Sequence, residues 1–248
     1  MLNTKDVKIA TKKHFGEKIS EIDRRLATYE MLLKEGFLML PSASRPKVPV
    51  YLLSAKSFRL LRSLRELLPL GHYEPCRVLM RASYEANILA AHLSKDEADS
   101  RRWLNGEQIP MREIRAKGRV ATWDALWSSL CNQTHPNIDG LLVKPLKLDE
   151  EPEPFGFVVT DPPEVEAIFQ PKECEHLLLH LDIEICKGAM LQVVLFGHSI
   201  LDRSTELSDR VAELYKHITR LLGRPDLAKM IRATERKFGL NLMYRKNR

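Results

Sequence analysis

Apolar residues recur at intervals of three and four positions along most of this 248-residue chain. An α-helix has 3.6 residues per turn, so this spacing gathers the apolar side chains on one face of a helix. Within residues 4–34 the recurrence includes Val7, Ala10, Phe15, Ile19, Ile22, Leu26, Tyr29 and Leu33. We therefore expect a long amphipathic helix at the start of the chain, ending before Gly36.

The same periodicity predicts most of the remaining chain to be helical, with prolines and glycines marking the helix ends. The expected helices span residues 50–68, 75–93, 95–104, 111–134, 164–169, 171–200, 204–222 and 225–238. Pro75 suits a first helical turn, where its missing N–H needs no partner. The prediction is an all-α bundle of about six to eight helices, formed by residues 1–248 as one domain.

Residues 137–163 depart from the helical pattern. The segment contains several prolines, a cluster of acidic residues and the β-branched run Phe155–Thr160. We expect an irregular insertion there, and a small β-hairpin pairing Leu141–Leu148 with Phe155–Thr160 is an alternative.

Positive charge is concentrated at the end of the chain. The formal net charge is +6, from 39 Lys and Arg against 33 Asp and Glu, and residues 224–248 contain eight basic residues against two acidic ones. Such a segment is a candidate contact for RNA, DNA or an acidic protein partner, and a merely solvated tail is the alternative.

The composition also indicates where in the cell we expect the protein and which cofactors we expect it to bind. The longest apolar run near the C-terminal half, Ala189–Leu201, is shorter than the roughly 20 residues that span a bilayer, and the start has no apolar signal-peptide core. The cysteines are scattered, at Cys76, Cys131, Cys174 and Cys186. We expect a cytoplasmic protein with reduced thiols and no membrane span. No glycine-rich phosphate loop or dinucleotide fingerprint occurs, so no cofactor is expected.

A polar stripe interrupts the apolar helix expected at 75–93. Arg81 and Glu85 stand four positions apart, so they share a helix face and can form an ion pair. Arg77 lies on the same stripe, and His92 lies near it. An exposed pair of this kind is ordinary, whereas a buried one needs partners on another helix. The apolar neighbours favour a central helix.

The helix expected at 111–134 ends at His135 and Pro136. A polar line leads to this end through residues that share one helix face, namely Asp124, Ser128, Cys131 and His135. The negative end of the helix dipole favours a protonated imidazole, so His135 is a candidate proton donor or anion contact. The alternative is that His135 caps the carbonyls of its own helix end.

A third stripe lies on the helix expected at 171–200, where Glu173, His176, His180 and Glu184 share a face. His176 and His180 have the i,i+4 spacing of a helical zinc pair, although the glutamate of the metalloprotease motif is absent between them. They are candidate metal ligands, and a solvated helix face is the alternative.

The segments VLMRASYEANILAAHLSKDEADSRRWL and LCNQTHPN resemble the core of an uncharacterised bacterial helical family. Its members carry an Arg-x-x-x-Glu helix and a later Leu-Ser-x-x-x-His-Pro helix end. Arg81 and Glu85 match the first motif and His135–Pro136 the second, with Cys131 in place of the family's serine. The resemblance covers about residues 75–137 and implies an all-α fold without bringing a known reaction.

That family is in turn similar to HEPN-type helical domains, many of which are ribonucleases of toxin–antitoxin and phage-defence systems. These enzymes use an Arg-x(4–6)-His motif at a dimer interface, which makes a homodimer one expectation. His135 has no arginine at that spacing. The spacing occurs instead at Arg210–His217 and at Arg65–His72.

Two functional hypotheses follow. In the first, Arg81, Glu85 and His135 meet in a pocket that binds an anionic ligand or a nucleic-acid phosphate, with Arg81 as anion clamp and His135 as proton donor in a HEPN-like ribonuclease. In the second, the same network is structural and the protein is a non-enzymatic interaction or scaffold module. Whether the protein is an enzyme stays open between them. Metal-dependent hydrolysis through His176 and His180 is a third hypothesis.

Overall fold

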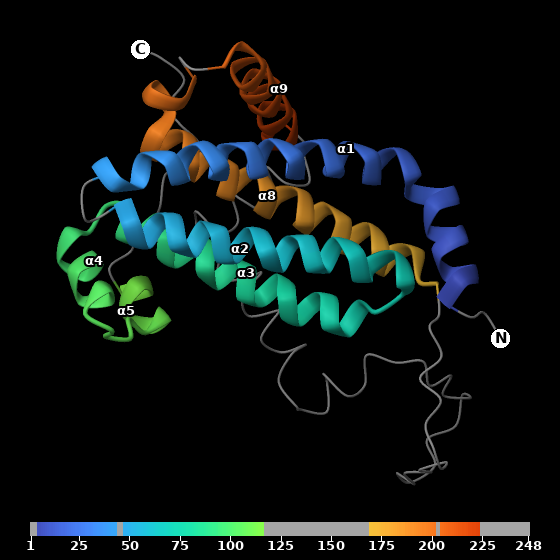
Figure 1. Cartoon of the computed structure of the whole chain (residues 1–248). Helices are drawn as coiled ribbons and strands as arrows, with labels where there is room; N and C mark the ends of the chain where they lie inside the picture. Colours follow the sequence, from blue (N-terminus) through green and yellow to red (C-terminus); the bar gives the residue numbers. More distant parts are fainter. Residues whose placement is uncertain (1–3, 44–46, 117–168, 202–203, 224–248) are drawn as a thin grey trace, which may run out of the picture.

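A computed structural model describes residues 4–43, 47–116, 169–201 and 204–223 (Figure 1). These residues contain seven α-helices and two short 3-10 helices, and they include no strand. The α-helices are α1 (Thr4–Met39), α2 (Lys47–Leu67), α3 (Tyr73–Leu93), α4 (Glu97–Leu104), α5 (Met111–Ala116), α8 (Pro171–Leu201) and α9 (Thr205–Leu222). The 3-10 helices are η1 (Leu40–Ser42) and η2 (Leu68–Leu70). The predicted all-α fold is confirmed.

Several sequence-based expectations fall on other parts of the chain. The insertion at 137–163 with its optional hairpin, the helix end at His135 and the basic segment 224–248 lie outside the described residues. Within those residues, none of the helices combines the length and the apolar character that crossing a bilayer requires.

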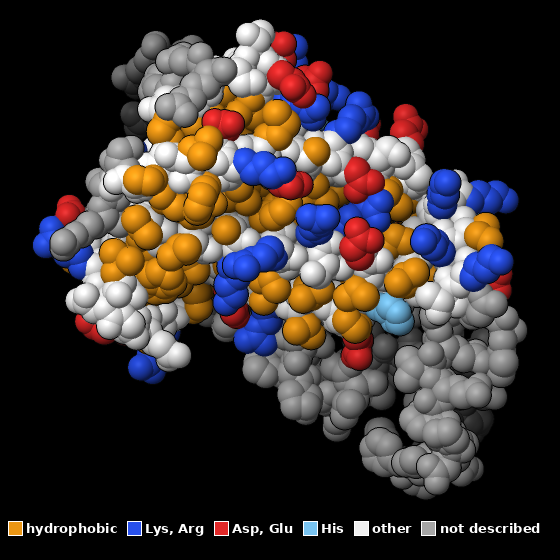
Figure 2. Space-filling model, viewed as in Figure 1, with side chains coloured by type: hydrophobic (Ala, Val, Ile, Leu, Met, Phe, Trp, Pro, Cys, Tyr) orange, Lys and Arg blue, Asp and Glu red, His pale blue; other side chains and the backbone are white. Residues whose placement is uncertain are grey.

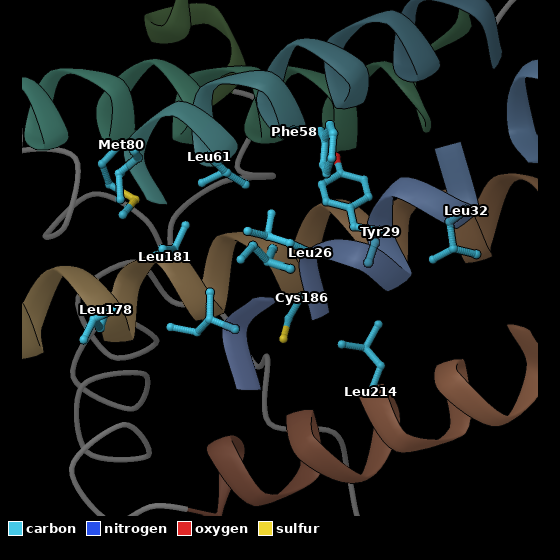
Figure 3. Packing of buried hydrophobic residues seen from close by; sticks show 14 of the residues in the cluster. Leu26, Tyr29, Leu32, Phe58, Leu61, Met80, Leu178, Leu181, Cys186 and Leu214 are labelled. Atoms are coloured by element: carbon cyan, nitrogen blue, oxygen red, sulfur yellow. The ribbon is translucent and has the colours of Figure 1, made fainter. Parts of the chain in front are cut away.

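The four long helices α1, α2, α3 and α8 lie alongside one another and form the body of the bundle (Figure 1). α8 contacts α1, α2 and α3, and α9 packs across α1 and α8. The main core cluster includes Tyr29 and Leu32 of α1, Phe58 of α2, Met80 of α3 and Leu181 of α8 (Figure 3). The apolar periodicity of the sequence therefore marks the faces that meet in this core.

The predicted end of the first helix before Gly36 is wrong, since α1 continues to Met39. Gly36 is buried where α1 meets α8. A Cβ atom at this position would lie 3.2 Å from Gln192 Oε1 and 3.4 Å from the Phe196 ring. The glycine therefore allows two helices to approach closely, and the packing gained there outweighs its low helix propensity.

Local sequence signals are found at three other helix ends. The side chain of Ser204 accepts a hydrogen bond from Leu207 N at 3.2 Å and caps α9, as the serine at the predicted helix start favours. The chain leaves α2 through η2, which contains Pro69, and turns at Gly71 with φ 81°. Pro75 lies in the first turn of α3, although the helix begins two residues earlier than predicted, at Tyr73.

Candidate functional site

A single buried carboxylate links three helices at the junction of α1, α8 and α9. Asp182 Oδ1 of α8 accepts a hydrogen bond from Arg25 Nε of α1 at 2.6 Å. Asp182 Oδ2 lies 2.8 Å from His217 Nε2 of α9. The Asp182 side chain is only 5% exposed, so it depends on these partners to offset its loss of hydration.

Cys186 lies one helical turn from Asp182, with its Sγ 3.9 Å from Asp182 Oδ1. Its side chain points from α8 toward Leu214 of α9 (Figure 3). Burial raises the pKa of the Cys186 thiol to about 12, and the neighbouring Asp182 carboxylate adds to the increase. In the absence of a metal ion, the thiol is neutral at physiological pH.

Asp182 and its partners Arg25 and His217 lie beside a polar pocket of about 620 Å³ between α1 and α9. Arg25 and His217 are among the lining residues. The other charged side chains of the lining are Glu21, Arg24, Glu206, Asp209, Arg210, Glu213, Lys216 and Arg220. Charges of both signs gather along the edge of the molecule where α9 meets α1 (Figure 2). Five basic and four acidic side chains thus line the pocket, which gives it a small excess of positive charge that an anionic ligand can contact.

The register of α9 decides which of its residues reach the pocket. Leu207, Val211 and Leu214 recur every three or four positions and are buried in the core. Arg210 and His217, seven positions apart, share a neighbouring face and both line the pocket. Arg210 pairs with Glu206 at 2.9 Å on the same helix. One of the two Arg-x(6)-His matches in the sequence therefore lies at the pocket.

The second match lies elsewhere. Arg65 of α2 donates two hydrogen bonds of 2.7 Å to Asp23 of α1, and His72 is exposed just before α3 begins. Neither residue lines the pocket between α1 and α9.

Arg81 and Glu85 form the predicted ion pair along α3, with Nε and Oε1 3.0 Å apart. Their side chains are 24% and 35% exposed, so the pair lies at the edge of the bundle rather than in its interior. His135 lies outside the described residues. A pocket in which all three meet remains a prediction.

Polar contacts join α3 to both ends of the predicted α8 stripe, and Arg77 is the member of the predicted α3 stripe that takes part. Arg77 is buried and contacts Glu173 Oε1 through Nε at 3.0 Å and through Nη2 at 2.8 Å. Ten residues further along α3, Asn87 donates a 2.8 Å hydrogen bond to Glu184. Lys187 also contacts Glu184, at 2.7 Å. Glu184 is fully buried, so this end of the α8 stripe is not the solvated face given as the alternative.

His176 and His180 lie within hydrogen-bond distance of each other, with their Nε2 atoms 2.9 Å apart. His176 is exposed, whereas His180 is buried. Burial is the main cause that lowers the pKa of His180 to about 3, with the positive charges of His176 and Lys187 contributing. Two groups of three ligand atoms suited to a metal occur in the described part of the chain, and neither includes this pair.

His92, which the sequence places near the Arg81–Glu85 stripe, contacts α4 instead. Its Nε2 lies 2.6 Å from Asp99 Oδ2, and both side chains are buried where α3 meets α4. Arg102 contacts the other Asp99 oxygen at 2.9 Å. This network ties α4 to the end of α3.

Asp182 and Arg25 were not predicted from the sequence as site residues. The available signal is a lone aspartate inside an apolar run, HLLLHLDIEIC, where a carboxylate needs a partner from elsewhere in the fold. Arg25 gives no comparable signal, since it lies on a helix rich in exposed charges.

No protein-family model, curated protein or solved structure matches the chain.

Proposed function

We propose that the protein binds single-stranded RNA with a backbone phosphate in the pocket between α1 and α9, and cleaves it with His217 as the proton-transferring group. The observation that carries the proposal is the Arg25–Asp182–His217 chain beside a pocket with several cationic side chains. Buried charges that orient a histidine next to a cleft are typical of catalytic sites.

The contact between Asp182 and His217 sets the tautomer that the reaction needs. A carboxylate next to Nε2 favours the proton on that nitrogen, which leaves Nδ1 as the basic nitrogen of the ring. Nδ1 can then take the proton of an RNA 2′-hydroxyl while the 2′-oxygen attacks phosphorus. The 5′-oxygen leaves with a proton from water. The products carry a 2′,3′-cyclic phosphate and a 5′-hydroxyl.

Basic side chains of the pocket, which outnumber the acidic ones by five to four, supply the positive charge for a phosphate. Arg210, Lys216 and Arg220 of α9 line the pocket together with Arg24 of α1. Arginine and lysine bind phosphate oxygens and stabilise the negative charge that develops in the transition state. The spacing of Arg210 and His217 also matches the Arg-x(4–6)-His motif of HEPN-type ribonucleases, which supports the same assignment.

Two alternatives are kept because specific observations favour them. Arg81, Glu85 and His135 carry the motifs of the helical family, so they are a second candidate site for the same chemistry. The non-enzymatic alternative rests on Asp182, since a buried carboxylate that links three helices can be purely structural.

The test compares RNA cleavage by full-length wild-type protein and variants at the two Arg-x(6)-His positions. An unstructured RNA with a 5′ fluorophore is incubated with each protein in EDTA, and DNA of the same sequence, which lacks the 2′-hydroxyl, serves as a substrate control. We expect His217→Asn to lower the cleavage rate by about 100-fold or more, since proton transfer contributes about 10² to 10⁴. Arg210→Ala should mainly weaken RNA binding.

His72→Asn and Arg65→Ala are the matched controls, because they have the same spacing away from the pocket. Both should cleave RNA like the wild type. Loss of cleavage in His135→Ala but not in His217→Asn would transfer the activity to the second candidate site. If wild type neither binds nor cleaves RNA at low salt, while Asp182→Asn lowers the melting temperature, the structural alternative is correct.

A further inference from the structure

We propose that Asp182, Cys186 and His217 form a binding site for a zinc ion. One carboxylate oxygen of Asp182, the Cys186 sulfur and a ring nitrogen of His217 all lie within 4.8 Å of one another. The site itself does not depend on RNA cleavage, and only its inhibitory effect, argued below, rests on the proposed function.

The backbone brings the three ligands together before any ion binds. Asp182 and Cys186 are four positions apart on α8 and so lie on one face, and Cys186 points toward α9 (Figure 3). His217 reaches the same place from α9, which packs on α8. Only small side-chain movements are then needed to complete the site.

Those movements follow from zinc geometry. Bonds of about 2.3 Å to sulfur and 2.0–2.2 Å to nitrogen and oxygen place the ligand atoms of a tetrahedral site about 3.4–3.6 Å apart. The Asp182 Oδ2 to His217 Nε2 distance is 2.8 Å, and the Cys186 Sγ to Asp182 Oδ1 distance is 3.9 Å. With Oδ2 as the ligand oxygen, the ion thus requires the first pair to open by about 0.6 Å, and it requires the sulfur, which lies within 4.8 Å of the other two ligand atoms, to close by at most about 1.2 Å.

The ligand chemistry selects zinc over magnesium or calcium. Thiolate and imidazole suit zinc, whereas magnesium and calcium favour oxygen ligands. When zinc binds, a Zn–S bond forms and the Cys186 thiol proton passes to the buffer. The thiolate and the Asp182 carboxylate then carry two negative charges. These two negative charges offset the charge of the zinc ion next to the positive Arg25 side chain. Arg25 keeps its hydrogen bond to Asp182 Oδ1 and so orients the carboxylate ligand.

Three protein ligands leave a fourth coordination position. Because His217 and Arg25 line the pocket, this position is reached from solvent and takes water or an anionic ligand. Zinc on Nε2 of His217 also excludes the contact with Asp182 that sets the tautomer for catalysis. We therefore infer that zinc inhibits RNA cleavage by occupying the catalytic histidine.

Cobalt(II) is the probe, because its spectrum reports sulfur ligation directly. Reduced full-length protein is titrated with Co²⁺, and we expect a saturable 1:1 complex with a near-ultraviolet sulfur-to-cobalt charge-transfer band that Zn²⁺ abolishes. Cys186→Ser should lose this band. His217→Gln should weaken Co²⁺ binding by at least about tenfold, the lower end of the loss seen for outer-shell partners.

Cys174→Ser is the matched control, because Cys174 is a buried cysteine on the same helix outside the cluster. Its charge-transfer band should match that of the wild type. The other three-ligand group, His92, Asp96 and Asp99, contains no sulfur and cannot produce the band. X-ray absorption at the zinc edge of the wild-type protein adds a variant-free measurement, with one sulfur and three nitrogen or oxygen neighbours expected.

Failure to bind Co²⁺, binding without the charge-transfer band, or a zinc edge spectrum without a sulfur neighbour would each overturn the metal site. RNA cleavage in EDTA is measured separately, so a failed metal site and a failed ribonuclease proposal remain distinguishable. If metal binds as proposed and RNA is not cleaved, the site stands and only the inhibitory role is lost.

Discussion

Asp182 and His217 are 35 residues apart in sequence, yet their side chains lie 2.8 Å apart across the interface of α8 and α9. The other oxygen of the same carboxylate holds Arg25 of α1. Asp182 is therefore both the structural link among three helices and the group that orients the histidine of the proposed site. A substitution at Asp182 should affect stability as well as function.

Asp182→Ala is expected to lower the free energy of unfolding by about 3–5 kcal/mol, because it leaves the Arg25 guanidinium, only 13% exposed, without its main partner. Glu97→Ala is the control. It removes the pair with Arg101, whose side chains are 68% and 61% exposed, and should cost less than about 1 kcal/mol. Urea denaturation measures the free energy of unfolding of both variants. If Asp182→Ala loses no more of this free energy than Glu97→Ala, the buried link does not stabilise the protein beyond an exposed ion pair.

Gly188→Ala should destabilise the protein by about 1–3 kcal/mol, as overpacking a core does. A Cβ atom there would fall on the Tyr29 ring, 2.5 Å from Cζ and 2.6 Å from Cε1. Tyr29 is fully buried and donates a hydrogen bond to the Ser54 carbonyl at 2.8 Å, so the ring cannot move aside cheaply.

Gly16→Ala is the matched substitution for Gly188→Ala, because the nearest atom to its new Cβ is Lys12 Cγ at 3.8 Å. With room for the methyl group, the higher helix propensity of alanine should stabilise the protein by about 0.5–1 kcal/mol. Thermal and urea denaturation should therefore give opposite signs for the two glycines. The same sign at both would mean that contact with Tyr29 does not set the cost at Gly188.

Helix positions were predictable from the sequence because they depend on periodicity and on local end signals. The start of α9 after Ser204 and the turn at Gly71 follow from such local chemistry. The continuation of α1 through Gly36 was not predictable. It depends on Gln192 and Phe196, which lie far along the chain and whose approach to α1 only the tertiary packing determines.

The candidate site also combines features that were predictable from the sequence with features that were not. The i,i+4 pairing of Arg81 and Glu85 was predictable, since both residues lie on one helix. The Arg-x(6)-His spacing was visible at two places in the sequence, but the choice of Arg210–His217 over Arg65–His72 as pocket residues required the structure. Asp182 joins residues from three helices, and no pattern along one helix can specify such a contact.

The thiols of Cys76, Cys174 and Cys186 should be unreactive in the native protein. Burial raises the pKa of each of the three to about 12, so the reactive thiolate is scarce at pH 7.5. Ellman's reagent on native, metal-free protein should label these three positions at least about tenfold more slowly than in guanidinium, with mass spectrometry to locate the label. Rapid native labelling of any of them would contradict the burial that the bundle gives them.

The stability of the protein should fall in mild acid because of His180. Its pKa is about 3 in the folded protein and 6.5 in the absence of structure, and burial is the main cause of the difference. Between these values the unfolded chain binds a proton that the folded protein excludes. The free energy of unfolding should therefore decrease as pH falls from about 6.5 toward 3, by up to about 1.4 kcal/mol per pH unit from this residue.

His180→Leu separates this contribution from that of the carboxylates, which titrate in part of the same range. Leucine fills the buried position without a proton to bind, so the variant should lose less stability than wild type between pH 6 and pH 4. His72→Gln removes an exposed histidine and should leave the wild-type slope unchanged. Urea denaturation at half-unit pH intervals measures all three slopes. If the His180→Leu slope equals that of wild type, His180 is protonated in the folded protein, and the burial of its side chain does not exclude the charge.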